Sequence, residues 1–225
     1  MYCPTCRKGT LELGKVQHYL DANSVAAVAV FEHTGPEELS GTFTVSAVCL
    51  NHRCKQSVVL AGDWRTVFDY DDDYSRMRYI DEFKLRYVNP ALTILSIPEG
   101  TPPGTVQAIE SAAALVWINP NAAANQLRQS LELLLTTRAI KVGPTLHDRI
   151  IMFRKTEPEV ADALMAVKWI GNSGSHDSAL SVEEVLTGAK ILELALRNLY
   201  DTTDADLMAR VRQINANKGL PKPTT

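Results

Sequence analysis

Four cysteines constrain the fold of this chain more than any other feature of its sequence. They form two close pairs in the first quarter of the chain, Cys3 with Cys6 and Cys49 with Cys54. When folding brings two such turns together, their sulfur atoms build a tetrahedral cage around one ion. The spacing therefore predicts a metal-binding ribbon at the N-terminus, with all four cysteines as ligands.

Zinc is the ion that suits four sulfur ligands, and a site with four protein ligands has no open position for water. We therefore expect a structural Zn²⁺ rather than a catalytic one. The second pair has the looser spacing, so His52 could replace Cys54 as a ligand. The alternatives are two disulfides or four independent thiols, and a reducing cytoplasm disfavours disulfides.

The composition is that of an ordinary globular protein. The 225 residues are 45% hydrophobic and carry a net charge of −3, which excludes a disordered or collagen-like chain. No apolar run approaches the roughly 20 residues of a membrane span, and the N-terminus lacks a secretory signal, so we expect a cytoplasmic protein without membrane contact. The charge argues against coating nucleic acid in bulk, although a local basic patch remains open.

The first part of the chain, residues 1–75, reads as a small antiparallel β domain around the ribbon. Thr42 to Val48 alternates polar and apolar residues, and the stretch from Val25 to His33 is rich in Val and Ala, as in strands. We expect the sheet to end near Trp64 or Phe68, followed by a solvated acidic turn at 69–74. Four prolines then predict an extended linker over residues 76–104.

From residue 105 to 216 the hydrophobic period becomes helical. Asn119-Pro120, Thr145 and Ser181 are typical helix starts, and they divide the segment into antiparallel helices. Residues 217–225 should form a flexible tail. The predicted fold class is therefore α+β, a small β zinc ribbon followed by an all-α bundle.

Two groups of polar residues fit a plain bundle poorly. Arg128 and Glu132 fall on the edge of a leucine stripe, either as an ordinary boundary pair or as a half-buried pair that anchors a polar neighbour. Further along, a second stripe lies opposite the core stripe of its helix. We weigh it as a surface turn, a partner or self-association face, or a ligand pocket; its members are Met165, Trp169, Asn172 and His176.

The order of these features resembles a bacterial family of unknown function that occurs alone or joined to type I restriction and other defence proteins. The resemblance rests on the cysteine pairs, on Arg128 and Glu132, and on Gly171, Asn172 and His176. That family is in turn similar to the HEPN superfamily of helical, dimeric domains. The resemblance implies a homodimer and, as partners, RNA or DNA or a restriction or defence protein.

Active HEPN proteins are metal-independent RNases whose motif places an arginine four to six residues before a histidine. The histidine moves the proton of the attacking hydroxyl, and the arginine stabilises the charged phosphate. Here His176 and Asn172 match, but Gly171 stands where the arginine is expected, and Lys168 is too far away. An arginine from elsewhere, such as Arg128 or one from a second subunit, could replace it.

The sequence therefore favours a non-catalytic interaction or nucleic-acid-associated module of a defence or restriction system. We expect it to dimerise through the helix that carries Trp169 and His176, with Arg128 and Glu132 organising a polar centre. The alternative is a HEPN-type endoribonuclease that uses His176 as acid and base, with Asn172 as a donor. A third possibility is a dimeric scaffold without any role in nucleic-acid binding.

Overall fold

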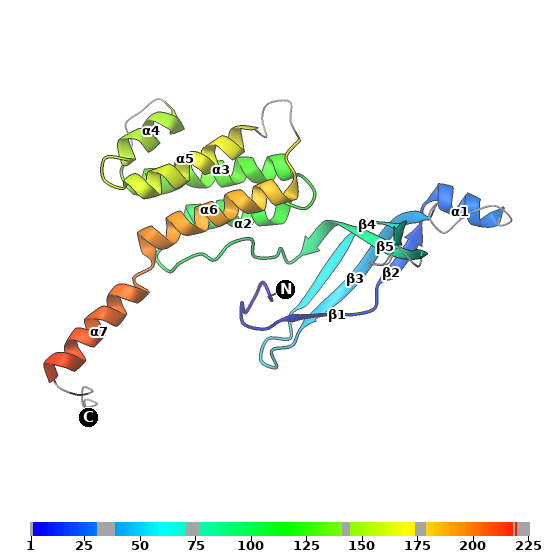
Figure 1. Cartoon of the computed structure of the whole chain (residues 1–225), viewed down its shortest axis with the longest axis horizontal. Helices are drawn as coiled ribbons and strands as arrows, with labels where there is room; N and C mark the ends of the chain where they lie inside the picture. The colour runs from blue at the N-terminus through cyan, green and yellow to red at the C-terminus, as the bar shows by residue number, and fades with distance from the viewer. Residues whose placement is uncertain are drawn as a thin grey trace.

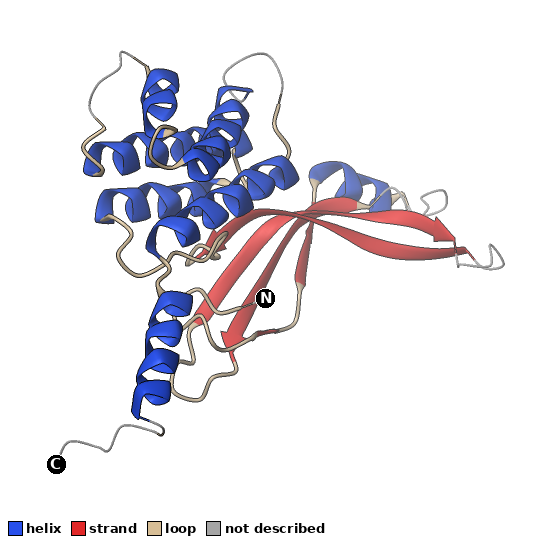
Figure 2. Cartoon of the chain, turned by 60° about the vertical axis from the view of Figure 1, so that its left-hand side comes forward, coloured by secondary structure: helices blue, strands red, loops and turns tan. Residues whose placement is uncertain are grey.

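The chain folds into a curled antiparallel sheet followed by a layer of helices (Figure 1). The structure is a computed structural model that describes residues 2–30, 39–70, 77–140, 145–173, 179–217 and 219. The sheet and the helices of residues 103–217 occupy opposite sides of the molecule in both Figure 1 and Figure 2, whereas the short helix of residues 22–29 lies beside the sheet. The predicted α+β class is confirmed.

The sheet has two short strands along one edge and three longer strands beside them. Both β1 and β2 pair antiparallel with β3, β3 pairs with β4, and β4 pairs with β5. The alternation in β3 buries Phe43, Val45 and Ala47 in the core of the sheet, as expected for a strand with one exposed face. The strands are β1 (Leu11–Leu13), β2 (Gln17–Leu20), β3 (Ser40–Cys49), β4 (Ser57–Tyr70) and β5 (Met77–Asn89).

Two segments of the β part differ from the sequence prediction. Residues 77–89, which we expected in an extended linker, form β5 and extend the sheet well beyond residue 75. Residues 25–29, expected in a strand, lie in the helix α1 (Ala22–Ala29), because the Asp21 side chain accepts a hydrogen bond from the Ser24 N–H and caps a helix there. The predicted acidic turn lies largely outside the described residues, since 71–76 are not among them.

Three helices of the helical layer begin at the capping residues that the sequence predicts. Asn119 and Thr145 each accept a backbone N–H at a helix start, and Ser181 forms a reciprocal capping box with Glu184. The helices are α2 (Pro103–Leu115), α3 (Pro120–Thr137), α4 (Leu146–Phe153), α5 (Pro158–Ser173), α6 (Val182–Tyr200) and α7 (Thr203–Asn217). Most of the expected tail, 217–225, lies outside the described residues.

Two hydrophobic cores meet at one side chain. The helical core is built around α3, where Leu127, Leu131 and Leu134 are buried at the heptad-like spacing that the sequence showed. The sheet has a smaller core of its own. Trp117, in the connection between α2 and α3, packs against both cores, so it ties the sheet to the helical layer.

The last helix stands apart from the others. Figure 2 shows α7 projecting away from the helical layer, and Leu207, Met208 and Val211 on it are exposed. Of the helices that the structure describes, none is both long enough and apolar enough to cross a membrane.

Candidate metal centre

The first cysteine pair lies on a tight turn at the N-terminus. The Cys3 N–H donates to the carbonyl of Gly9 at 2.8 Å, and the Arg7 N–H donates to the carbonyl of Cys3 at 2.9 Å. Arg7, directly after Cys6, has a φ of 53° in the left-handed region. The chain thus curls around the sulfur of Cys6 before it enters β1.

The second pair lies on a similar turn between β3 and β4. The N–H groups of Cys54 and Lys55 both donate to the carbonyl of Asn51, at 2.9 and 3.1 Å. Lys55, directly after Cys54, has a φ of 52°, close to that of Arg7. The two turns therefore repeat one local geometry, in which a left-handed residue follows the second cysteine.

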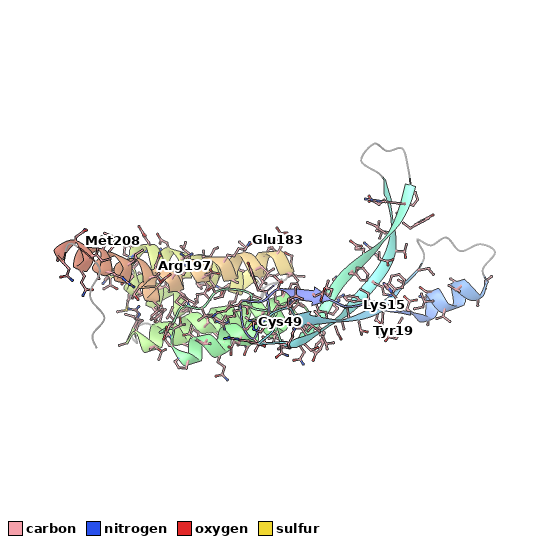
Figure 3. The ribbon with its side chains drawn as sticks, turned by 90° about the horizontal axis from the view of Figure 1, so that it is seen from below. Lys15, Tyr19, Cys49, Glu183, Arg197 and Met208 are labelled. Atoms are coloured by element: carbon pink, nitrogen blue, oxygen red, sulfur yellow. The ribbon has the colours of Figure 1, made fainter. Side chains whose placement is uncertain are left out.

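Strand pairing brings the two turns together. Leu11 of β1 pairs with Cys49 of β3, and the Leu50 N–H donates to the carbonyl of Thr10 at 2.9 Å. A Cβ atom on Gly9 would lie 2.4 Å from the Cys49 sulfur, so only glycine allows this approach. Figure 3 places Cys49 at the end of the sheet that faces the helices.

The four sulfur atoms lie within 4.8 Å of one another. The Sγ atoms of Cys3 and Cys54 are 3.8 Å apart, and those of Cys6 and Cys49 are 3.7 Å apart. A tetrahedral zinc site with Zn–S bonds of about 2.3 Å places its sulfurs about 3.8 Å from each other. The cluster is therefore compatible with zinc, as the sequence predicted for these four residues.

Two nearby hydrogen-bond donors favour the thiolate form of Cys6. The Gly9 N–H donates to the Cys6 Sγ at 3.4 Å, and the Asn51 Nδ2 donates to the same sulfur at 3.7 Å. Hydrogen bonding from the Gly9 backbone is the main cause that lowers the pKa of Cys6 to about 6, whereas burial raises the pKa of Cys49 to about 12. Four thiols alone therefore do not all ionise at neutral pH, and a bound divalent cation would supply the missing positive charge.

The two candidates for the fourth position, Cys54 and His52, differ in their place relative to the cluster. Cys54 contributes its sulfur to the cluster, and the exposed His52 is not part of it. Sequence spacing alone left both residues open.

Arg128 and Glu132 form a half-exposed pair on α3, with Nη2 and Oε1 3.2 Å apart. The Nε of Arg128 is buried and has no hydrogen-bond partner within the described part of the chain. The stem of Arg128 lies against Gly171 of α5, where an added Cβ would come within 2.8 Å of the Arg128 Cβ and 3.1 Å of the Ala124 carbonyl oxygen. Arg128 thus occupies the contact between α3 and α5.

The predicted second stripe does not lie on one surface. Met165 is buried in the helical core, which removes it from any exposed face of the single chain, whereas Trp169 is 54% exposed. The Lys168 Nζ lies 3.5 Å from the centroid of the Trp169 ring. Asn172 is half-buried, α5 continues to Ser173, and His176 lies outside the described residues.

Two stretches of the chain match known families. Residues 110–217 match the family described as Domain of unknown function (DUF4145), and residues 1–88 match Domain of unknown function (DUF8608). The searches of curated proteins and of solved structures each gave no match. The first match covers most of the helical layer and the second covers the cysteine centre and the sheet.

Sequence reasoning missed the residues that support the centre. Gly9 and Asn51 hold the sulfur atoms in place without being ligands. In the sequence, only their positions hint at this role, because Gly9 follows Cys6 by three residues and Asn51 lies inside the second turn. Such residues are recognised once the pairing of β1 with β3 is known.

Proposed function

We propose that this chain is a non-catalytic interaction module of a bacterial defence or restriction system, held together at one end by structural zinc. The sulfur geometry supports the zinc, and the resemblance of the sequence to defence-associated proteins supports the setting. The helical layer provides self-association. The module acts through what it binds rather than through chemistry at a catalytic centre.

The observation that carries the proposal is the packing of Gly171. A HEPN-type RNase needs an arginine near this position to stabilise the charged phosphate. Here the contact with Arg128 and the Ala124 carbonyl leaves no space for any side chain at position 171. The other nearby cation, Lys168, is largely buried and covers the Trp169 ring. Both features favour a fold that has lost the cutting activity.

Self-association through α5 is supported by Trp169. An indole that is about half exposed on a helix is typical of the aromatic anchors of protein interfaces. Its ring lies 6.3 Å from the ring of His147 on α4, so the candidate face includes both helices. We propose that a second copy of the chain covers this face.

One observation favours a second function. The Arg128 stem lies against the place where the motif arginine would begin, so its guanidinium could take over the role on the phosphate. In that case the chain is an RNase with Arg128 and His176 in the catalytic roles. The half-exposed pair with Glu132 would have to open for this to occur.

The test is incubation of the full zinc-loaded chain with mixed RNA, with and without EDTA, and with His176→Ala and Arg128→Ala as variants. Intact RNA at high protein concentration supports the non-catalytic module. Cleavage that persists in EDTA and disappears in both variants overturns it in favour of the RNase.

Self-association is tested by light scattering after gel filtration. Trp169→Glu should convert a dimer to a monomer, whereas Leu194→Glu, a change at a similarly exposed apolar residue on α6, should leave the dimer intact. A monomeric wild-type chain, or a dimer that resists Trp169→Glu, contradicts the proposed interface.

A further inference from the structure

The two cysteine turns contain several cations and no acidic residue of their own. Residues 1–11 and 48–62 contain four lysines and arginines and none of the 26 acidic residues of the chain. The chain as a whole is acidic, with a net charge of −3, so this charge is concentrated locally. The four cations are all exposed: Arg7, Lys8, Arg53 and Lys55.

The cysteine cluster holds the two cation-bearing turns next to each other. Because the four sulfurs lie within 4.8 Å of one another, the residues beside Cys6 and Cys54 are held close together. The left-handed backbone at Arg7 and Lys55 fixes the two equivalent positions in the same way. Among the described contacts, none of the four cations takes part in an ion pair.

Part of this charge balances the metal centre itself. Four thiolates around Zn²⁺ carry a formal charge of about −2, and nearby cations reduce its cost. Arg7 also lines cavities with Glu110 of α2 and Glu183 of α6, so its charge is offset by these carboxylates. The remaining cations, Lys8, Arg53 and Lys55, still exceed what that balance requires. The excess leaves a basic patch on an acidic protein, which is the electrostatic pattern of a phosphate-binding surface.

We infer that the two cysteine turns bind the phosphate backbone of single-stranded nucleic acid. This inference rests on the proposed function, because it names what the non-catalytic module holds. The single strand is favoured over the duplex by Tyr2, which is 70% exposed next to Cys3 and offers a ring on which an unpaired base can stack. Unpaired cations supply the attraction to phosphates, and the stacking is independent of base sequence.

The experiment measures fluorescence anisotropy of labelled single-stranded RNA and DNA with the zinc-loaded full chain over a range of salt concentrations. Lys8→Glu with Arg53→Glu should weaken binding at least tenfold at low salt and lower the steepness of the log–log salt dependence by about 1.4, the loss of two phosphate contacts. These two residues are chosen because neither has the left-handed backbone of Arg7 and Lys55.

The matched control is Arg210→Glu with Arg212→Glu on α7, which makes the same change in net charge at exposed positions. It should leave the affinity within twofold of the wild type. Tyr2→Ala should weaken single-stranded binding about tenfold or more and leave duplex binding unchanged. Equal losses in both double variants would show a general charge effect and overturn the inference.

Zinc content is measured in every variant. If the glutamate pair releases zinc, Lys8→Ala with Arg53→Ala replaces it, and a zinc-loaded alanine variant that binds as tightly as the wild type overturns the inference. The length of the RNA is checked in the same samples. Cleaved RNA contradicts the non-catalytic function, whereas intact RNA without any binding contradicts only the assignment of this surface.

Discussion

Gly171 of α5 lies directly against Arg128 of α3, so closely that an added Cβ would come within 2.8 Å of the Arg128 Cβ. This contact lets the two helices approach each other beside the exposed Trp169. The same contact occupies the position at which an RNase motif would require an arginine. One glycine thus accounts both for helix packing and for the proposed loss of cutting activity.

Gly171→Ala should therefore lower the free energy of unfolding by roughly 1–3 kcal/mol, because the new methyl group forces α3 and α5 apart. Gly104→Ala is the control, since a Cβ there meets the two Leu133 methyl groups at 3.7 and 3.8 Å, which are ordinary contacts. Alanine also favours the helix by up to about 1 kcal/mol. Urea unfolding followed by circular dichroism measures both. A Gly171→Ala variant as stable as the wild type would mean that the helices do not pack as described.

Trp117 should couple the unfolding of the sheet to that of the helical layer, because its ring contacts both cores. Trp117→Ala should cost roughly 2–4 kcal/mol and separate two transitions: release of zinc to an indicator dye, and loss of helical circular dichroism. Leu194→Ala removes an exposed apolar side chain on α6 and should change stability by no more than about 0.5 kcal/mol. Coincident transitions in Trp117→Ala would argue against this coupling.

The sulfur distances predict which disulfides form when the metal is removed and the thiols are oxidised. Hydrogen peroxide takes two electrons and two protons from each thiol pair and leaves as two water molecules. The Sγ atoms of Cys3 and Cys54 lie 3.8 Å apart and those of Cys6 and Cys49 lie 3.7 Å apart, so both disulfides should link one turn to the other. Peptide mapping by mass spectrometry without reduction identifies the pairs. A dominant link between Cys3 and Cys6 would show that the turns separate once the metal leaves.

Asp21 should make the folded state sensitive to acid. Its carboxylate accepts hydrogen bonds from the Ser24 N–H and from the Ser40 hydroxyl, and these lower its pKa below the unfolded value of 3.8. The stabilisation is therefore present above that pH and is lost as the pH falls through the lower, folded pKa. Asp21→Asn should be less stable than the wild type at pH 7, and the difference should shrink at pH 3. A difference that is constant between the two pH values would exclude this linkage.

The features that were predictable from the sequence are those set by neighbouring residues. The four cysteines could be paired from spacing alone, and the starts of α3, α4 and α6 followed from the capping side chains of Asn119, Thr145 and Ser181. Features that depend on distant partners were not predictable. β5 mixes charged and aromatic residues and becomes recognisable as a strand only when paired with β4.

The candidate site also combines features that the sequence predicts with features that depend on distant partners. Its four cysteines were visible in the sequence, but the presence of Cys54 rather than His52 in the cluster depended on how the second turn folds. The support from Gly9 depended on the pairing of β1 with β3, which brings that glycine against Cys49. The contact between Arg128 and Gly171 likewise joins two helices that lie far apart in the sequence.

The most direct test of the account is the zinc content of the chain. The protein is purified without added metal, and its zinc is measured by inductively coupled plasma mass spectrometry. The geometry predicts one zinc per chain in the wild type and in His52→Ala, and loss of zinc in Cys49→Ser and Cys54→Ser. A wild-type chain that has four reduced thiols and no bound metal would contradict the central claim. So would zinc that survives Cys54→Ser and disappears in His52→Ala.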